Sequence, residues 1–176
     1  DLDNDGDRDF VHTAAMPFSL FFGGGLVSQS QVWMCEDQGF VNRTEEWGLG
    51  ILEDRAAHGM AWCDMDLDGD LDVMVAIYAL ECQGLWMTEN VLLEQEGGQF
   101  VDVSEPSGLA AGIQASFQGA WLDFNGDGLQ DIFVINDAGI DANCPTQNQA
   151  FINGGDGSFT ESAAEMGLDV AMSAMS

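Results

Sequence analysis

Short apolar segments alternate with polar, glycine-rich segments along the whole chain. The segment from Val73 to Tyr78 is apolar at every position and rich in β-branched residues, which predicts a strand buried on both faces. Ile132 to Asn136 has the same character, and Phe10 to Ala15 predicts a third strand of this kind. These runs are of strand length, so we expect a chain rich in β-structure with little helix.

A phenylalanine-led phrase recurs after each of these strands. Phe40, Phe100 and Phe159 each begin a short polar–apolar segment that ends in a glycine–leucine pair, and the copies lie about 60 residues apart. Glycine turns precede the last two copies, at Gly97-Gly98 and at residues 154–157, and they predict hairpins. The chain is therefore built from repeats.

Two further strands complete each repeat. Gly59 to Cys63 and Gly119 to Leu122 are short apolar segments, and we interpret their tryptophans, Trp62 and Trp121, as core residues. Gln31 to Cys35 predicts the third strand of the first repeat, and Trp86 to Glu94 a weaker one in the second.

Four short strands per repeat are typical of the blades of a β-propeller. We predict an all-β fold of about three four-stranded antiparallel repeats of about 60 residues, forming part of a larger propeller. The expected blades are residues 1–49, which lack the first strand, 50–109, and 110–176, which include the start of the next linker.

An acidic nine-residue loop precedes the central strand of every repeat. Aspartate or asparagine occupies loop positions 1, 3, 5 and 9, and glycine occupies position 6. Alternate carboxylates in a tight turn converge on one point, where a cation relieves their repulsion, and Ca²⁺ accepts six to eight oxygen ligands in flexible geometry. The loop is not an EF-hand, because position 12 of the second copy is Val75 within the strand.

We predict three Ca²⁺ sites, one per loop. Their expected side-chain ligands are Asp1, Asp3, Asp5 and Asp9; Asp64, Asp66, Asp68 and Asp72; and Asp123, Asn125, Asp127 and Asp131. The residues at position 7 are expected to contribute backbone carbonyls: Asp7, Asp70 and Leu129.

The charge of the chain narrows the possible partners. It has 31 acidic residues against three arginines, for a net charge of −28. This argues against nucleic acid or an anionic membrane surface as a partner. The most apolar stretch, Met16 to Val27, is too short and too glycine-rich for a membrane span.

Cysteine and histidine give weaker signals. Cys82 and Cys144 follow the central strand at similar places in successive repeats, which makes them candidates for a disulfide, although two free thiols are a nearly equal alternative. The two histidines, His12 and His58, have no recognisable nucleophile motif nearby, so we interpret them as packing or surface residues.

The last repeat has a pattern of three segments: Trp121 to Asp131, the strand Ile132 to Asn136, and Asn153 to Leu168. This pattern resembles the FG-GAP/VCBS repeats of integrin-α-like β-propellers. Trp62 to Asp72 resembles them equally well, and the first repeat does so from Asp1 onward. The resemblance implies a Ca²⁺-stabilised propeller at the cell surface or outside the cell, used in adhesion or protein interaction. It also implies ions that brace hairpins within blades, away from the partner-binding face.

We therefore expect a non-enzymatic extracellular module whose protein or glycan ligand is unknown. The alternative is a propeller portion of a secreted hydrolase or lyase whose active site lies outside this segment. Because the first residue is already an expected ligand, we also expect the sequence to be a segment of a longer or processed chain. Further blades, from the same chain or from symmetric copies, are then expected to close the ring.

Overall fold

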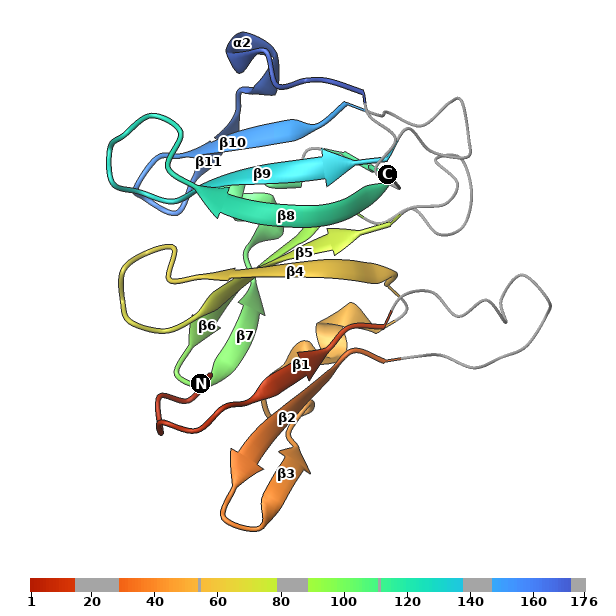
Figure 1. Cartoon of the computed structure of the whole chain (residues 1–176), viewed down its shortest axis with the longest axis vertical. Helices are drawn as coiled ribbons and strands as arrows, with labels where there is room; N and C mark the ends of the chain where they lie inside the picture. The colour runs from red at the N-terminus through yellow and green to blue at the C-terminus, as the bar shows by residue number, and fades with distance from the viewer. Residues whose placement is uncertain (15–28, 54, 79–88, 111, 138–146, 172–176) are drawn as a thin grey trace, which may run out of the picture.

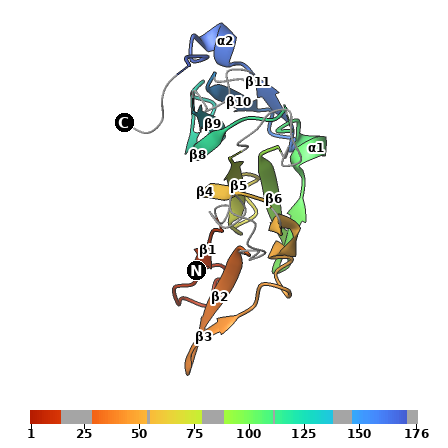
Figure 2. The same cartoon turned by 90° about the vertical axis from the view of Figure 1, so that its right-hand side faces the viewer.

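The computed structural model describes residues 1–14, 29–53, 55–78, 89–110, 112–137 and 147–171. These residues form three antiparallel sheets that follow one another along the long axis of the molecule (Figures 1 and 2). We call the sheets blades 1, 2 and 3 in chain order. This arrangement confirms the predicted all-β fold of propeller-like blades.

The strands follow the chain in order across each blade. Blade 1 has three strands, and blades 2 and 3 have four each. Their bounds are β1 Phe10–His12, β2 Gln31–Glu36 and β3 Gly39–Asn42; β4 Ala57–Cys63, β5 Asp72–Ile77, β6 Val91–Glu96 and β7 Gln99–Asp102; and β8 Ser116–Leu122, β9 Asp131–Asn136, β10 Gln149–Asn153 and β11 Phe159–Glu161.

In the part of the chain that the structure describes, helix is confined to single turns that follow the last strand of each blade. These are the 3-10 turn η2 (Leu49–Leu52) and the α-helical turns α1 (Ser104–Ser107) and α2 (Ala163–Met166). Among the described residues, no helix has the length and apolar character needed to cross a membrane.

Four of the predicted strands have different boundaries in the structure. The strand expected from Phe10 to Ala15 ends at His12. The third strand of blade 2 runs from Val91 to Glu96 instead of Trp86 to Glu94, and Val91, Leu92 and Leu93 are fully buried. The tryptophan-bearing strands start earlier than expected, at Ala57 and Ser116, and each contains a register shift that a short apolar segment does not reveal.

Two hydrophobic clusters join the blades. Alternate residues of β5 point to opposite sides, so Val73, Val75 and Ile77 pack towards blade 1 while Met74 and Ala76 pack towards blade 3. All six residues of β5 are buried, which confirms the prediction of a strand covered on both faces. Burying each large side chain contributes about 1.5–3 kcal/mol, so contacts between blades are a main source of stability.

The glycine–leucine pairs at the ends of the first two repeats lie at close approaches between blades. Gly48 and Gly108 have positive φ, 71° and 83°. A Cβ atom on Gly48 would lie 3.0 Å from the Phe100 carbonyl oxygen, and one on Gly108 would lie 2.8 Å from the Phe159 carbonyl oxygen. The glycine of one blade therefore gives room for the phenylalanine strand of the next, which explains why the two motifs recur together.

The proposed cysteine pair, Cys82 and Cys144, lies outside the described residues. Cys35 and Cys63 are described, and both are free and half-buried.

Candidate metal centres

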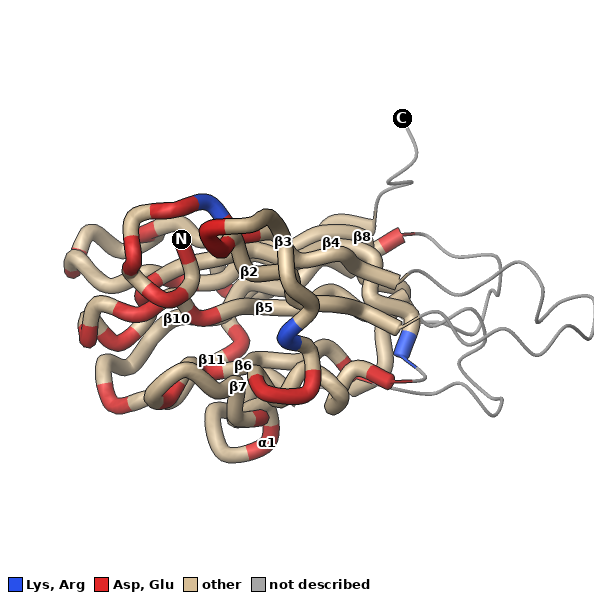
Figure 3. The backbone as a smooth tube through the Cα atoms, turned by 90° about the horizontal axis from the view of Figure 1, so that it is seen from below, with Lys and Arg blue, Asp and Glu red and all other residues tan. Residues whose placement is uncertain are grey.

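The three acidic loops lie along one side of the stack of blades, one loop in each blade (Figure 1). The second loop joins β4 to β5, the third joins β8 to β9, and the first leads into β1 (Figure 1). Figure 3 looks along the stack and shows most acidic segments on this side, where the N-terminus also lies. Each loop therefore sits at the start of the central strand of its blade, as expected from the sequence.

The loops share one pattern of hydrogen bonds between side chains and backbone. The side chain at position 3 accepts the N–H of position 5, at 3.2 Å in loops 1 and 2 and 3.0 Å in loop 3. The carboxylate at position 5 accepts the N–H of position 7 at 2.8 Å in all three loops. In these turns, short polar side chains form local hydrogen bonds with the backbone in place of the hydrogen bonds of a β-ladder.

The carboxylate at position 1 closes the turn around the glycine at position 6. The Oδ2 atoms of Asp1, Asp64 and Asp123 accept the glycine N–H groups at 3.2, 3.2 and 3.1 Å. These glycines have φ values between 91° and 101°, as the predicted sharp turn requires.

Position 4 also adopts a left-handed backbone, which the sequence analysis missed. Its φ is 60° at Asn4, 66° at Leu67 and 76° at Gly126. Asparagine and glycine are the residues that tolerate this conformation best, so their presence in two of the three loops was the available signal. Leu67 bears the strain of a left-handed leucine and is 68% exposed.

The carboxylate at position 9 is buried and anchors each loop to its blade. One oxygen of Asp72 accepts the N–H of Met65, at loop position 2, at 2.9 Å, and the other accepts the N–H of Gln95 in β6 at 2.9 Å. Asp9 and Asp131 make the equivalent pairs of bonds, with lengths from 2.7 to 2.9 Å. Because a carboxylate has about four lone-pair sites, these bonds leave acceptor capacity for an ion.

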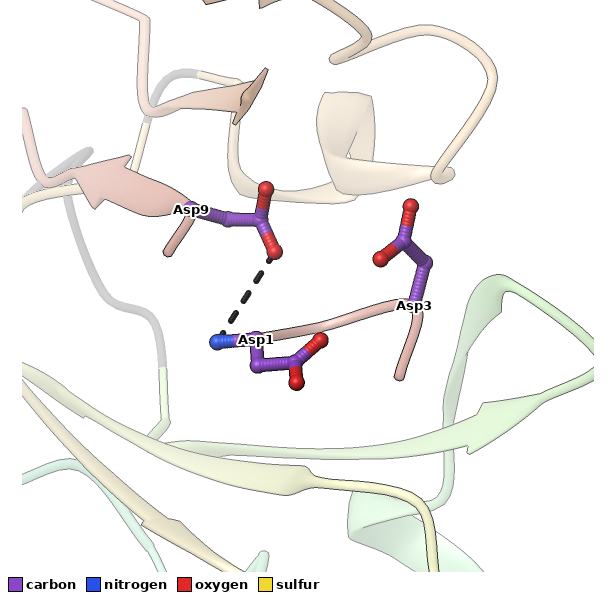
Figure 4. Close-up of side chains that lie close together, drawn as sticks. All are labelled: Asp1, Asp3 and Asp9. Carbon is purple, nitrogen blue, oxygen red and sulfur yellow. Dashed lines mark ion pairs between the residues drawn. The ribbon is translucent and has the colours of Figure 1, made fainter. Parts of the chain in front are cut away.

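The carboxylates at positions 1, 3 and 9 converge in the first two loops. In each of the groups Asp1, Asp3, Asp9 and Asp64, Asp66, Asp72, one oxygen per residue lies within 4.8 Å of the others. Figure 4 shows the first of these groups. Two oxygens bound to one Ca²⁺ at 2.3–2.6 Å are at most about 5 Å apart, so the spacing fits a single ion. In loop 1 the amino group of Asp1 also lies 3.8 Å from Asp9 Oδ2.

Loop 2 holds an acceptor without a protein donor. Asp64 Oδ1 is buried and has no hydrogen-bond partner among the described residues, although the other oxygen of this carboxylate accepts the N–H of Gly69. Burial raises the pKa of Asp72 to about 6; the N–H groups of Met65 and Gln95 oppose this rise, and the nearby Asp66 and Asp68 carboxylates add to it. A divalent cation would satisfy the free oxygen and offset the crowded negative charge.

The other predicted ligands are arranged as follows. Asp5 and Asp68, at position 5, accept the N–H of the residue at position 7. The side chain of Asp70 turns outward and accepts a hydrogen bond from Asn4 of loop 1 at 3.0 Å, which agrees with a role for its backbone alone.

The third loop differs from the other two at position 3. Asn125 occupies this position and donates from its amide nitrogen to Asp127 at 2.8 Å, while its oxygen accepts the N–H of Asp127. The loop thus keeps the shared turn with one carboxylate fewer.

Comparison with protein families finds a match in the last third of the chain. Residues 123–176 match the FG-GAP-like repeat, from the first aspartate of loop 3 through β9, β10 and β11. This part of the chain is similar to an FG-GAP-like repeat. Blade 2 has the same strand order and loop hydrogen bonds as this repeat. A comparison with curated proteins finds no match.

Proposed function

We propose that this chain is a calcium-binding β-propeller segment that acts as a structural, adhesion or protein-interaction module outside the cell or on its surface. The observation that carries the proposal is the buried, unpartnered Asp64 Oδ1 within a group of three converging carboxylates. The repeated loop geometry extends the proposal to three Ca²⁺ sites, one at the start of each central strand.

Bound Ca²⁺ would supply a positive charge and a coordination shell that hold each loop closed. The ligands would be the side chains at positions 1, 3, 5 and 9 and the carbonyl at position 7: Asp1, Asp3, Asp5, Asp7 and Asp9; Asp64, Asp66, Asp68, Asp70 and Asp72; and Asp123, Asn125, Asp127, Leu129 and Asp131. The residues themselves supply the turn, the buried closing carboxylate and its anchoring to the blade.

The proposed role is in binding and not in catalysis, and the positions of the two histidines in the scaffold support this part of the proposal. The histidines occupy ordinary positions: the ring of His58 packs 5.0 Å from Tyr78 and 4.9 Å from Phe117, and His12 is exposed on β1. A strongly acidic protein whose loops need a divalent cation suits a medium in which calcium is abundant, which supports the extracellular location.

Calorimetric titration of the chain with CaCl₂ tests the metal sites. We expect three ions per chain, and Asp64→Asn should remove or weaken the site in loop 2 because it takes the charge from the unpartnered oxygen. The matched control is Glu105→Gln, which removes an exposed acidic charge outside the loops. Calcium should also raise the melting temperature, and EDTA should reverse this rise. An Asp64→Asn protein that binds calcium as well as the control would contradict the proposal.

A further inference from the structure

Gln95 and Asn153 occupy the same position in β6 and β10 and make the same two kinds of bond. The backbone N–H of Gln95 donates to Asp72 of its own blade at 2.9 Å, and its side-chain amide donates to the Leu2 carbonyl of the preceding loop at 3.0 Å. In the next blade, Asn153 N–H donates to Asp131 at 2.8 Å and its amide donates to the Met65 carbonyl at 3.3 Å. Both side chains are buried, with 3% and 4% exposed.

The residue at loop position 2 completes the connection. The N–H of Leu2 donates to the closing carboxylate of loop 1, Asp9, at 2.7 Å, and the N–H of Met65 donates to Asp72 at 2.9 Å. A continuous path of buried and half-buried hydrogen bonds therefore runs from Asp131 through Asn153 to Asp72, and from there through Gln95 to Asp9. We call this path the interblade relay.

We propose that Gln95 and Asn153 are positioning residues that couple neighbouring metal loops, so that an ion in one loop raises the affinity of the next. This inference rests on the calcium sites proposed above. An ion in loop 2 fixes the Asp72 carboxylate, which holds the backbone of Gln95, and the amide of Gln95 then fixes the peptide chain of loop 1. Breaking a buried hydrogen bond leaves the remaining group unsatisfied, which costs free energy. The hydrogen bonds of the relay therefore favour forming together.

The coupling is reciprocal and has an order along the chain. By linkage, loop 1 affects loop 2 as strongly as loop 2 affects loop 1. Loop 2 lies in the middle: the relay connects it to loop 1 through Gln95 and to loop 3 through Asn153. Asn4 of loop 1 also donates directly to Asp70 at the exposed side of loop 2. In blade 1 the equivalent residue is Cys35, whose N–H donates to Asp9 at 2.9 Å but whose thiol is only a weak donor.

Calcium titrations of four variants of the full chain test the coupling between loops 1 and 2. All four variants carry Asp127→Ala, which disables loop 3. Two of them keep loop 2 intact and two disable it by Asp68→Ala, and one variant of each pair also carries Gln95→Met. With Gln95 present, disabling loop 2 should weaken calcium binding at loop 1 about tenfold, within the usual range of coupling between sites. With Gln95→Met, the same change should weaken loop 1 less than about twofold.

Gln118→Met is the matched control. Gln118 also donates from its side-chain amide to a carbonyl of the preceding blade, that of Met60 at 3.3 Å, but it lies outside the relay. This variant should keep the tenfold dependence. If Gln95→Met keeps it as well, or if Gln118→Met abolishes it equally, the relay is not the path of coupling and the inference is overturned.

Hydrogen exchange without calcium separates this inference from the proposed function. Gln95→Met should speed exchange of the loop 1 amides of Leu2, Gly6 and Asp7, whereas Gln118→Met should leave them unchanged. Unchanged exchange in Gln95→Met would overturn the positioning role. Absence of calcium uptake by the unmodified chain would overturn the proposed function and the coupling of ions, while faster exchange would still show that Gln95 positions loop 1.

Discussion

Neighbouring aspartates within one loop have different roles despite identical side chains. In loop 2, Asp68 accepts the N–H of Asp70 and faces the turn, whereas the side chain of Asp70 turns away towards Asn4 of loop 1. The turn geometry of alternate positions in the loop was predictable from the spacing alone. The buried closing carboxylate with two backbone donors was not, because its second donor, Gln95, is distant in sequence.

Asp68→Ala should therefore weaken calcium binding at loop 2 by at least about tenfold, because it removes both a carboxylate ligand and the cap on the Asp70 N–H. Asp70→Ala should change the affinity by less than about threefold, since the carbonyl that it is expected to contribute is retained. Calorimetry on the two variants checks this difference, and equal losses would contradict the ligand assignment.

His58 gives a residue-scale prediction on pH. Burial against Tyr78 and Phe117 lowers its pKa from the ordinary value of 6.5. The unfolded chain therefore binds the His58 proton more tightly than the folded chain does. This reduces the free energy of unfolding, in full at pH values below the folded-state pKa, and the reduction disappears as pH rises past about 6.5. An NMR titration should give a His58 pKa below 6.5, and His58→Gln should flatten the part of the stability profile between these two values. A His58 pKa at or above 6.5 would contradict the packed position.

At the scale of elements, the central strands were the most predictable feature, because a strand buried on both faces is apolar at every position. Their ends were less predictable, because at the end of each ladder a side chain, and not the backbone of the next strand, accepts the N–H. The N–H of Ala14 donates to Ser30, that of Ile77 to Asn90, and that of Asn136 to Asn148. Each of these acceptors directly precedes the strand that pairs with the central strand on its second side (β2, β6 or β10), a recurring polar position that could have fixed the boundaries.

Glycine substitution at the blade ends tests how closely the elements approach. Gly108→Ala should be destabilising because alanine is strained at a φ of 83° and its Cβ would lie 2.8 Å from the Phe159 carbonyl oxygen. Gly167→Ala is the matched control, since φ is 70° there and no atom lies within 4 Å of the added Cβ. We expect a loss of about 1–2 kcal/mol for Gly167→Ala and about 1–3 kcal/mol more for Gly108→Ala. Urea unfolding measures both, and equal losses would contradict a close approach at Gly108.

At the scale of the whole molecule, blade 1 has an uncovered apolar face. Phe10, Trp33 and Phe40 pack together there, with ring centroids 5.9 and 5.0 Å apart for Phe10–Trp33 and Phe10–Phe40. Phe40 is 51% exposed, whereas its equivalents Phe100 and Phe159, which pack against the preceding blade, are 5% and 6% exposed. The face therefore has the pattern of a surface that receives another blade.

The 176-residue chain should consequently self-associate in solution. Phe10 and Phe40 are strongly exposed, and covering them against the apolar face of a blade from another copy would remove them from water. Light scattering should give a mass above that of the monomer, and Phe10→Ser with Phe40→Ser should lower it. Val101→Ser is the control, since Val101 is 40% exposed on β7 outside this face, and it should leave the mass unchanged. A monodisperse monomer with a cooperative melt would instead mean that the three blades are stable without further partners, and the expectation of additional blades would have to be abandoned.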